Sequence, residues 1–263
     1  MKQRPSFPAR LDTGKPQAAP KTLMGATRVV MPPSPVRVKP AGVVSPTGVG
    51  LDSSAIRARM VQKLAGQGID DAVVLEAMGR VERHRFVDSA LVNQAYEDTS
   101  LPIGLGQTIS KPNVVARMLE LLREGRSGRL GRVLEIGTGC GYQAAVLSHL
   151  AVEVYSIERL RGLHDKARDN LRHFRLPNVH LLFGDGMEGF AKGAPYAAII
   201  AAAGGEAIPQ AWVDQLAVGG RLVAPMQTAA GQQALVVIDK TAQGIRQSVL
   251  EAVHFVPLKS GTD

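Results

Sequence analysis

Hydrophobic residues recur at helical spacing after Ser53, and this pattern predicts three helices before residue 95. The first helix ends near Gly66, and its inward face is formed by Ile56, Met60, Val61 and Leu64. The second is expected to begin at a cap on Asp70, with an inward face formed by Val73, Val74, Ala77 and Met78. The third covers roughly residues 87–94. A glycine-containing loop, residues 101–110, then leads to a helix opening at Lys111-Pro112, because proline suits the first helical turn.

From residue 132 onward the pattern alternates between strands and helices. Strands are expected over 132–136, 152–158, 179–182, 196–201 and 221–225, and helices over 142–150, 160–174 and 209–216. This alternation is typical of βαβ units, so we expect an α/β fold with a doubly wound, mostly parallel Rossmann-like sheet covered on both faces. The last two strands, 234–240 and 248–255, lie too close together for a crossover helix and should form an antiparallel hairpin.

Residues 1–50 have a different composition from the remainder. They contain nine of the 16 prolines, eight basic residues against one acidic residue, and no sustained helical or strand period. Such a segment buries too little apolar surface to offset the entropy of ordering. We therefore predict a disordered basic extension over 1–50 and a folded domain over 51–263, with a helical N-terminal part at 51–125. A tether to nucleic acid or a membrane surface, and a processed targeting segment, are the alternatives for the extension.

Composition excludes several other classes of protein. No apolar run approaches the roughly 20 residues of a membrane span, so a transmembrane protein is not expected. A single cysteine, Cys140, excludes a disulfide framework and a cysteine zinc cluster, and it suits a reducing compartment. Aromatic residues are only 4% of the chain, which argues against a base-stacking surface. Most of the net charge of +8 lies in the extension. We expect a cytoplasmic monomer that needs no metal, membrane or nucleic acid.

The strongest local signal is a glycine-rich turn between a buried strand and a helix. Gly137, Gly139 and Gly141 follow the strand 132–136, and such glycines let the backbone turn tightly and approach a ligand. Glu158 ends the next strand, about 20 residues after Gly139, where a carboxylate can accept both hydroxyls of a ribose. The pattern predicts a nucleoside cofactor. A dinucleotide fits loosely in the frame from Gly139 to Ala144, but the frame from Gly137 fails at Tyr142.

Two further acids distinguish between the possible cofactors. Glu135 stands just before the glycines, near where the ammonium of S-adenosylmethionine would sit. Asp185, in Gly184-Asp-Gly186, follows the third strand and could accept from an adenine amino group. Acids at three successive strand ends favour a cationic nucleoside over a dianionic dinucleotide, so we predict S-adenosyl-L-methionine as the cofactor.

The chain from about Ser54 to Leu258 resembles the protein-L-isoaspartate O-methyltransferases, which repair damaged aspartyl and asparaginyl residues. The motif specific to that family is Leu101-Pro-Ile-Gly-Leu-Gly-Gln-Thr-Ile-Ser110. Other matching motifs follow in the family's order: Val133-Leu-Glu-Ile-Gly-Thr-Gly-Cys-Gly-Tyr142, Ser156-Ile-Glu-Arg159, Gly184-Asp-Gly186, Ile208-Pro209, Gly219-Gly-Arg-Leu222 and Val253-His-Phe-Val-Pro-Leu258. The resemblance implies a class I methyltransferase fold.

The resemblance also implies roles for individual residues. Ser110 would be the catalytic serine that holds the substrate carboxylate beside the methyl group, although an ordinary helix cap is the alternative for this hydroxyl. Ile109, Val256 and Pro257 would contact the substrate peptide. Cofactor contacts are implied for Gln107, Thr108, Glu135, Gly137, Gly139, Gly141, Glu158, Arg159, Asp185 and Gly186.

The chain departs from the family pattern at several positions. Ala197 stands where an aspartate is usual, and residues 201–205 read Ala-Ala-Ala-Gly-Gly where a threonine or glycine, alanines and prolines are usual. Met226-Gln227 replaces Val-Gly, and Cys140 replaces a common serine. Residues 201–205 lie near the expected reaction centre, so they bear on peptide fit and catalytic efficiency more than on cofactor binding.

The activity implied is methyl transfer from S-adenosyl-L-methionine to the α-carboxylate of L-isoaspartyl residues in damaged peptides and proteins. The resulting ester then closes to a succinimide away from the enzyme. The alternative is a methyltransferase acting on another carboxylate or on a small molecule or RNA, which would not need the 107–110 loop. A dehydrogenase fits the glycine turn poorly, and a non-catalytic relic is suggested only by the departures at 197–205.

Overall fold

The computed structural model describes residues 54–229 and 231–263. The predicted disordered extension over 1–50 lies outside the described residues. Within the described part, a seven-stranded sheet has the order β5-β4-β3-β6-β7-β8-β9, and a two-stranded sheet is formed by β1 and β2. The strands of the large sheet are β3 (Leu130–Ile136), β4 (Ala151–Glu158), β5 (Val179–Phe183), β6 (Tyr196–Ala201), β7 (Leu216–Gln227), β8 (Gln233–Thr241) and β9 (Gly244–Val253).

The sheet has the predicted topology. Strands β3 to β7 pair in parallel, whereas β8 runs antiparallel to both β7 and β9. Because β3 lies between β4 and β6, the strand order reverses there, and ligands of doubly wound sheets bind at the carboxyl ends of strands at such a point. The terminal hairpin of β8 and β9 is confirmed, with β9 beginning at Gly244 rather than at residue 248.

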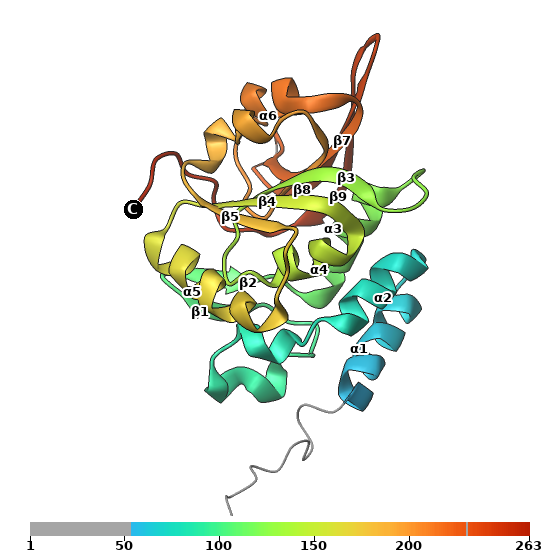
Figure 1. Ribbon diagram of the computed structural model, residues 1–263. Coiled ribbons are helices and arrows are strands. Elements are labelled where there is room, and N and C mark those ends of the chain that lie inside the picture. Colours follow the sequence, from blue (N-terminus) through green and yellow to red (C-terminus); the bar gives the residue numbers. More distant parts are fainter. Residues whose placement is uncertain (1–53, 230) are drawn as a thin grey trace, which may run out of the picture. The chain divides into compact units, whose positions relative to one another are not determined.

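Helices cover the two faces of the sheet unequally, as Figure 1 shows. On one face lie α3 (Pro112–Arg123), α4 (Tyr142–Leu150) and α5 (Arg161–Leu171), with α1 (Ser54–Gly66) and α2 (Ala72–Arg80) outside them. The opposite face carries the short α6 (Gln210–Gln215) and a second apolar cluster that includes Trp212 and Leu134. Short 3₁₀-helices complete the described elements: η1 (Arg83–Phe86), η2 (Ser89–Gln94), η3 (Arg172–Phe174), η4 (Gly186–Glu188) and η5 (Ala191–Gly193).

Local details of the N-terminal part differ from the sequence prediction. Asp71, not Asp70, caps α2, because its carboxylate accepts the backbone N–H groups of Val73 and Val74. Val73 was expected on the inward face, but its side chain is 43% exposed. The third helix, predicted over roughly 87–94, is instead the 3₁₀-helix η2 at Ser89–Gln94, and η1 lies just before the predicted range.

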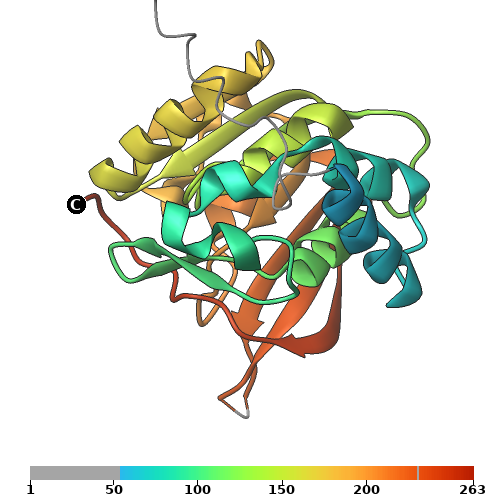
Figure 2. The same cartoon turned by 90° about the horizontal axis from the view of Figure 1, so that it is seen from below.

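The loop over residues 101–110 contains structure that the sequence reading left out. It forms a hairpin of β1 (Leu101–Gly104) and β2 (Gln107–Ile109), in which Leu101 pairs with Ile109. The turn places Gly104, Leu105 and Gly106 at positive φ, which glycine adopts readily at 104 and 106 and which is unusual for the leucine between them. Figure 2 shows this hairpin near the red C-terminal segment and the N-terminus of α5. Within the described residues, no helix is both long enough and apolar enough to cross a membrane.

Candidate active site

The glycine turn and Glu158 meet at the carboxyl edge of the sheet because β3 and β4 are neighbours. Gly137, Gly139 and Gly141 all have positive φ. One carboxylate oxygen of Glu158 accepts the Gly139 N–H at 2.8 Å, and the other accepts the Leu160 N–H at 2.9 Å. Glu158 is only 5% exposed. The carboxylate therefore braces the turn as well as facing the space above it.

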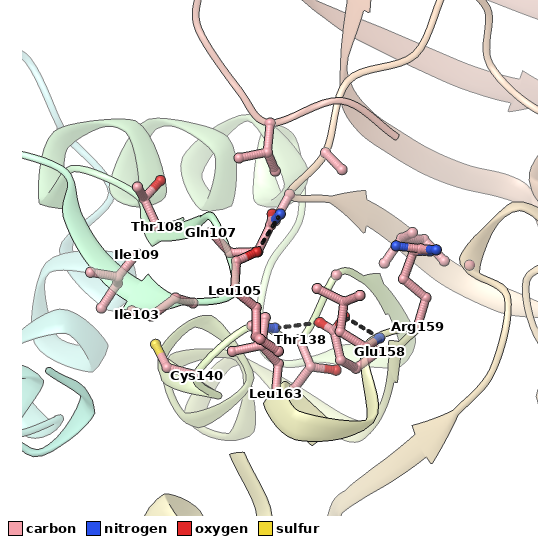
Figure 3. A pocket seen from close by; sticks show the side chains of 18 of the residues that line it. Ile103, Leu105, Gln107, Thr108, Ile109, Thr138, Cys140, Glu158, Arg159 and Leu163 are labelled. Atoms are coloured by element: carbon pink, nitrogen blue, oxygen red, sulfur yellow. Dashed lines mark hydrogen bonds between the residues drawn. The ribbon is translucent and has the colours of Figure 1, made fainter. Parts of the chain in front are cut away.

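A cavity of about 440 Å³ lies above this turn, a volume in the range of small-molecule sites. Figure 3 shows Gln107, Thr108 and Ile109 of β2 on one side of it and Glu158 with Arg159 on another. The segment after β9 closes a further side. The wall includes these predicted site residues: Gln107, Thr108, Ile109, Ser110, Gly137, Gly139, Glu158, Arg159, Gly186, Val256 and Pro257.

Three predicted site residues do not line the cavity: Glu135, Gly141 and Asp185. Gly141 stands at the N-cap of α4, and a Cβ there would lie 3.1 Å from the Leu171 side chain, so a close helix contact accounts for the glycine. Glu135 is fully buried below the turn. Asp185 caps η4, and both of its oxygens already accept backbone N–H groups, from Met187 and from Gly261.

Glu135 belongs to a buried polar cluster directly behind the cavity wall. Its Oε2 accepts a hydrogen bond from Ser156, whose hydroxyl also lies 2.6 Å from that of Thr138. Its Oε1 and the Nε2 of Gln143, a cavity-lining residue, are both buried without a hydrogen bond of normal length, and the nearby Gln143 amide opposes the effect of burial on the Glu135 pKa. Burial raises the pKa of Glu135 to about 8. An unpartnered buried acceptor and donor at this point fit the charged amino-acid end of a ligand.

The C-terminal segment crosses the rim of the cavity at Arg159. The Arg159 guanidinium donates to the Gly261 carbonyl at 2.9 Å and to the Asp263 side chain at 2.7 Å. Backbone hydrogen bonds join Asp263 N to Arg159 O and Arg161 N to Asp263 O. Lys259 and Asp263 of this segment line the cavity. These two residues were not predicted from the sequence, because they belong to no short motif.

Ser110 lies in the cavity wall between β2 and α3. The N-cap of α3 is Lys111, and no side chain caps that helix. Within the described part of the chain, the Ser110 hydroxyl has no hydrogen-bond partner, whereas its carbonyl accepts from Arg83. The helix-capping alternative therefore has no support in the geometry, and the hydroxyl is available to a ligand.

Comparison with known proteins identifies the family. The family model described as Protein-L-isoaspartate(D-aspartate) O-methyltransferase (PCMT) matches residues 55–263. A protein-L-isoaspartate O-methyltransferase of Methylibium petroleiphilum is 57% identical over 265 residues, covering 98% of this chain and 97% of the relative. The chain belongs to the protein-L-isoaspartate O-methyltransferase family.

Further members of this isoaspartate methyltransferase family are similar. One from Leptothrix cholodnii is 64% identical over 218 residues, covering 82% of this chain and 77% of the relative. A solved structure titled protein-L-isoaspartate O-methyltransferase is 27% identical with a TM-score of 0.70, and covers 78% of this chain and 66% of its own. A Plasmodium falciparum structure, titled as a putative family member in complex with S-adenosyl-L-homocysteine, shares the fold at 24% identity and a TM-score of 0.66.

The departures from the isoaspartate methyltransferase pattern have different surroundings. Ala197 lies near the start of β6, away from the cavity at the strand's other end, and is not part of the wall. Ala202 and Ala203 do line the wall. Gly204 donates to the Val256 carbonyl at 2.9 Å and accepts from Leu258 N at 2.8 Å, so it pairs with the predicted peptide-contacting segment.

Gln233 explains why residue 204 is a glycine. A Cβ on Gly204 would lie 2.7 Å from Gln233 Nε2 and 3.2 Å from the Pro225 Cβ. The same glutamine accepts the Phe255 N–H through Oε1 at 2.7 Å. The glutamine side chain thus occupies the space of an alanine at 204 and supports the backbone just before Val256. At residue 204 the departure from the family pattern is therefore matched by the Gln233 side chain, which fills the space next to the glycine.

Proposed function

We propose that the protein transfers a methyl group from S-adenosyl-L-methionine to the α-carboxylate of L-isoaspartyl residues, which initiates repair of damaged peptides and proteins. One observation carries the proposal: in a chain of this family, the Gln107–Ser110 segment and the glycine turn with Glu158 line the same cavity. We place the catalytic domain at 51–263. We further propose that it acts as a cytoplasmic monomer without nucleic acid or a membrane.

The residues around the glycine turn fit S-adenosyl-L-methionine. Glu158 keeps free lone pairs on both oxygens, so it can accept ribose hydroxyls while it braces the turn. The unpartnered Oε1 of Glu135 and Nε2 of Gln143 suit the ammonium and carboxylate of the amino-acid end. Gly137 and Gly139 give the ligand a close approach to the backbone. When bound, the cofactor supplies its methyl group as an activated sulfonium.

The chain's own residues then position the acceptor and do not activate it. A substrate carboxylate is already ionised at neutral pH, because carboxylic acids have a pKa of about 4, so no general base is needed. The Ser110 hydroxyl donates a hydrogen bond to this carboxylate and orients it without neutralising it. Ile109, Val256 and Pro257 hold the peptide. Positioning of this kind supplies roughly 7–11 kcal/mol when reacting atoms are aligned.

Exclusion of water assists the same step. Ile103 and Leu163 are buried in the cavity wall, and Leu105 lies across it at the tip of the β1–β2 hairpin. A dry cavity strengthens the hydrogen bond from Ser110 and reduces competition by water for the carboxylate. The methyl ester product leaves, and its neighbouring backbone nitrogen attacks the ester carbonyl and expels methanol, which closes a succinimide that water then opens in part to normal aspartate.

A matched pair of synthetic peptides, identical except for L-isoaspartyl or L-aspartyl linkage, tests the proposal. The normal residue carries its carboxylate one methylene further from the backbone, and a displacement of about 1 Å costs on the order of 100-fold in rate. We expect base-labile methyl incorporation into the isoaspartyl peptide alone. Equal incorporation would indicate a general carboxyl methyltransferase, and incorporation into neither peptide by cofactor-binding protein would indicate another acceptor.

A further inference from the structure

Arg83 is a charged residue in the core of the N-terminal part. It begins η1 and is 0% exposed. Within the described residues, 54–229 and 231–263, no ion pair includes it. Burial lowers the pKa of its guanidinium, and the Nη1 group is buried without a hydrogen-bond partner. A buried charge without a carboxylate is unfavourable for stability, so the arginine is poorly explained as a stabilising residue.

The remaining guanidinium contacts join three separate segments. Nε donates to the Ala95 carbonyl, just after η2, at 2.7 Å. Nη2 donates to the Ser110 carbonyl, also at 2.7 Å. The guanidinium carbon lies 4.7 Å from the centre of the Tyr142 ring, the first residue of α4 after the glycine turn. One side chain therefore bridges the substrate-side loop and the cofactor-side helix.

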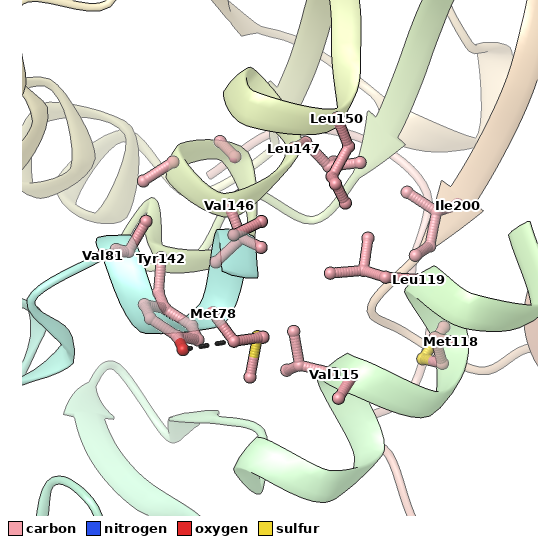
Figure 4. Packing of buried hydrophobic residues seen from close by; sticks show 14 of the residues in the cluster. Met78, Val81, Val115, Met118, Leu119, Tyr142, Val146, Leu147, Leu150 and Ile200 are labelled. Carbon is pink, nitrogen blue, oxygen red and sulfur yellow. Dashed lines mark hydrogen bonds between the residues drawn. The ribbon is translucent and has the colours of Figure 1, made fainter. Parts of the chain in front are cut away.

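Tyr142, on which the Arg83 guanidinium stacks, is itself held firmly by its neighbours. Its ring is 1% exposed and packs edge-on against Phe86 with centroids 5.5 Å apart. Its hydroxyl donates to the Met78 sulfur at 3.6 Å, and Figure 4 shows the ring facing Met78 with Val81 and Val115 nearby. A guanidinium held on this ring has little freedom to move. The Ser110 carbonyl that it binds is held at a set distance from α4.

We propose that Arg83 is a positioning residue that holds Ser110 in register with the glycine turn through hydrogen bonding to the Ser110 backbone carbonyl. Its effect on methyl transfer rests on the proposed function. A planar guanidinium can donate to two carbonyls in fixed directions while stacking on a ring, which an ammonium cannot do. Without the hydrogen bond from Arg83, the Ser110 backbone and its hydroxyl can shift relative to the glycine turn. A shift of about 1 Å costs on the order of 100-fold in rate.

The variants Arg83→Lys and Arg83→Met test the proposal. For both we expect kcat on an isoaspartyl peptide to fall by about ten-fold or more, with S-adenosylhomocysteine affinity within about two-fold of wild type. Amide hydrogen exchange should accelerate in residues 107–111. Because a methionine removes a buried charge without a carboxylate, Arg83→Met should melt no lower than Arg83→Lys.

Arg123→Lys is the matched control. Arg123 is also buried and also donates to a backbone carbonyl, that of Gly128, but it pairs with Asp71 and lies outside the cavity wall. We expect it to lower the melting temperature and to leave kcat unchanged.

Three results would overturn the positioning role. They are unchanged kcat in both Arg83 variants, an equal loss of kcat and cofactor affinity with faster exchange throughout the chain, or unchanged exchange in residues 107–111. If wild-type protein methylates no isoaspartyl peptide, the proposed function fails, and exchange in residues 107–111 still decides whether Arg83 holds the loop.

Discussion

Replacing Glu158 by alanine should weaken both the fold and the cofactor site. The two carboxylate oxygens accept the N–H groups of Gly139 and Leu160, and the side chain is 5% exposed. Removing the carboxylate leaves two donors unpaired, each at a cost of about 1–3 kcal/mol. Because both donors are partly exposed, the lower figure applies, and the free energy of unfolding should fall by about 2 kcal/mol. For a domain of this size the melting temperature should fall by about 4–8 °C.

Cofactor affinity should fall further than stability alone explains. Charge-assisted hydrogen bonds to ribose hydroxyls contribute about 1.5–3 kcal/mol, so the dissociation constant for S-adenosylhomocysteine should rise by about ten-fold or more. Glu158→Gln retains one acceptor oxygen and should lose less stability than alanine. Melting curves and titration calorimetry measure the two effects.

Glu153→Gln is the control on the same strand, because Glu153 is partly exposed and pairs with Arg132. A Glu158→Ala protein that melts like wild type would refute the bracing role. Unchanged affinity in that variant would refute the cofactor role.

The other predictions concern Ser110, the buried Glu135 and Gly204. Ser110→Ala should reduce kcat with cofactor affinity and melting temperature nearly unchanged; a lower melting temperature at full activity would restore the capping role. Glu135 should lose its proton when the cofactor ammonium binds, so affinity should rise as the pH rises toward about 8, and Glu135→Gln should abolish the proton release seen by calorimetry. Gly204→Ala should displace the Gln233 side chain, lower the free energy of unfolding by about 1–3 kcal/mol and weaken peptide binding. Gly66→Ala is the control and should be nearly neutral, because no atom lies within 4 Å of a Cβ at that position.

The raised pKa of Glu135 also predicts the sign of a stability effect. The folded protein holds this proton up to about pH 8, whereas the unfolded chain releases it near the ordinary value of 4.5. The fold therefore binds more protons than the unfolded chain between these two values, and the contribution of Glu135 to stability falls as the pH rises through that window. Denaturation of wild type and Glu135→Gln across this range checks it, and parallel stability curves for the two proteins would contradict it.

Sequence reasoning predicted the sheet and the core of the site because both follow from local pattern and chain order. The strand-turn-helix at 132–150 has a run of buried residues, three glycines and a helix in immediate succession. It failed where tertiary packing selected among local alternatives. Asp70 and Asp71 are adjacent and chemically equal as caps, and Asp71 is selected because its other oxygen pairs with Arg123, 52 residues away. The contact of Asp263 with Arg159 spans 104 residues and that of Gln233 with Phe255 spans 22, and neither follows a short motif.

The three acids at the strand ends show the same limit of sequence-based prediction. Their positions were predicted correctly, but their hydrogen-bond partners could not be predicted from the residue types. Glu158 is shared between the turn and the cavity, Glu135 is buried with a raised pKa, and Asp185 accepts from Met187 and Gly261.

The contact with Gly261 does not remove Asp185 from the predicted site. Each carboxylate oxygen has two lone-pair positions, so one backbone N–H on each leaves room for a further donor. Asp185 itself is not part of the cavity wall but its neighbour Gly186 is, so we propose that a cofactor amino group would reach Asp185 past Gly186 while the C-terminal segment stays in place. In that arrangement the segment held by Arg159 and Asp263 forms part of the cofactor site's wall and does not compete with the cofactor for its acceptor.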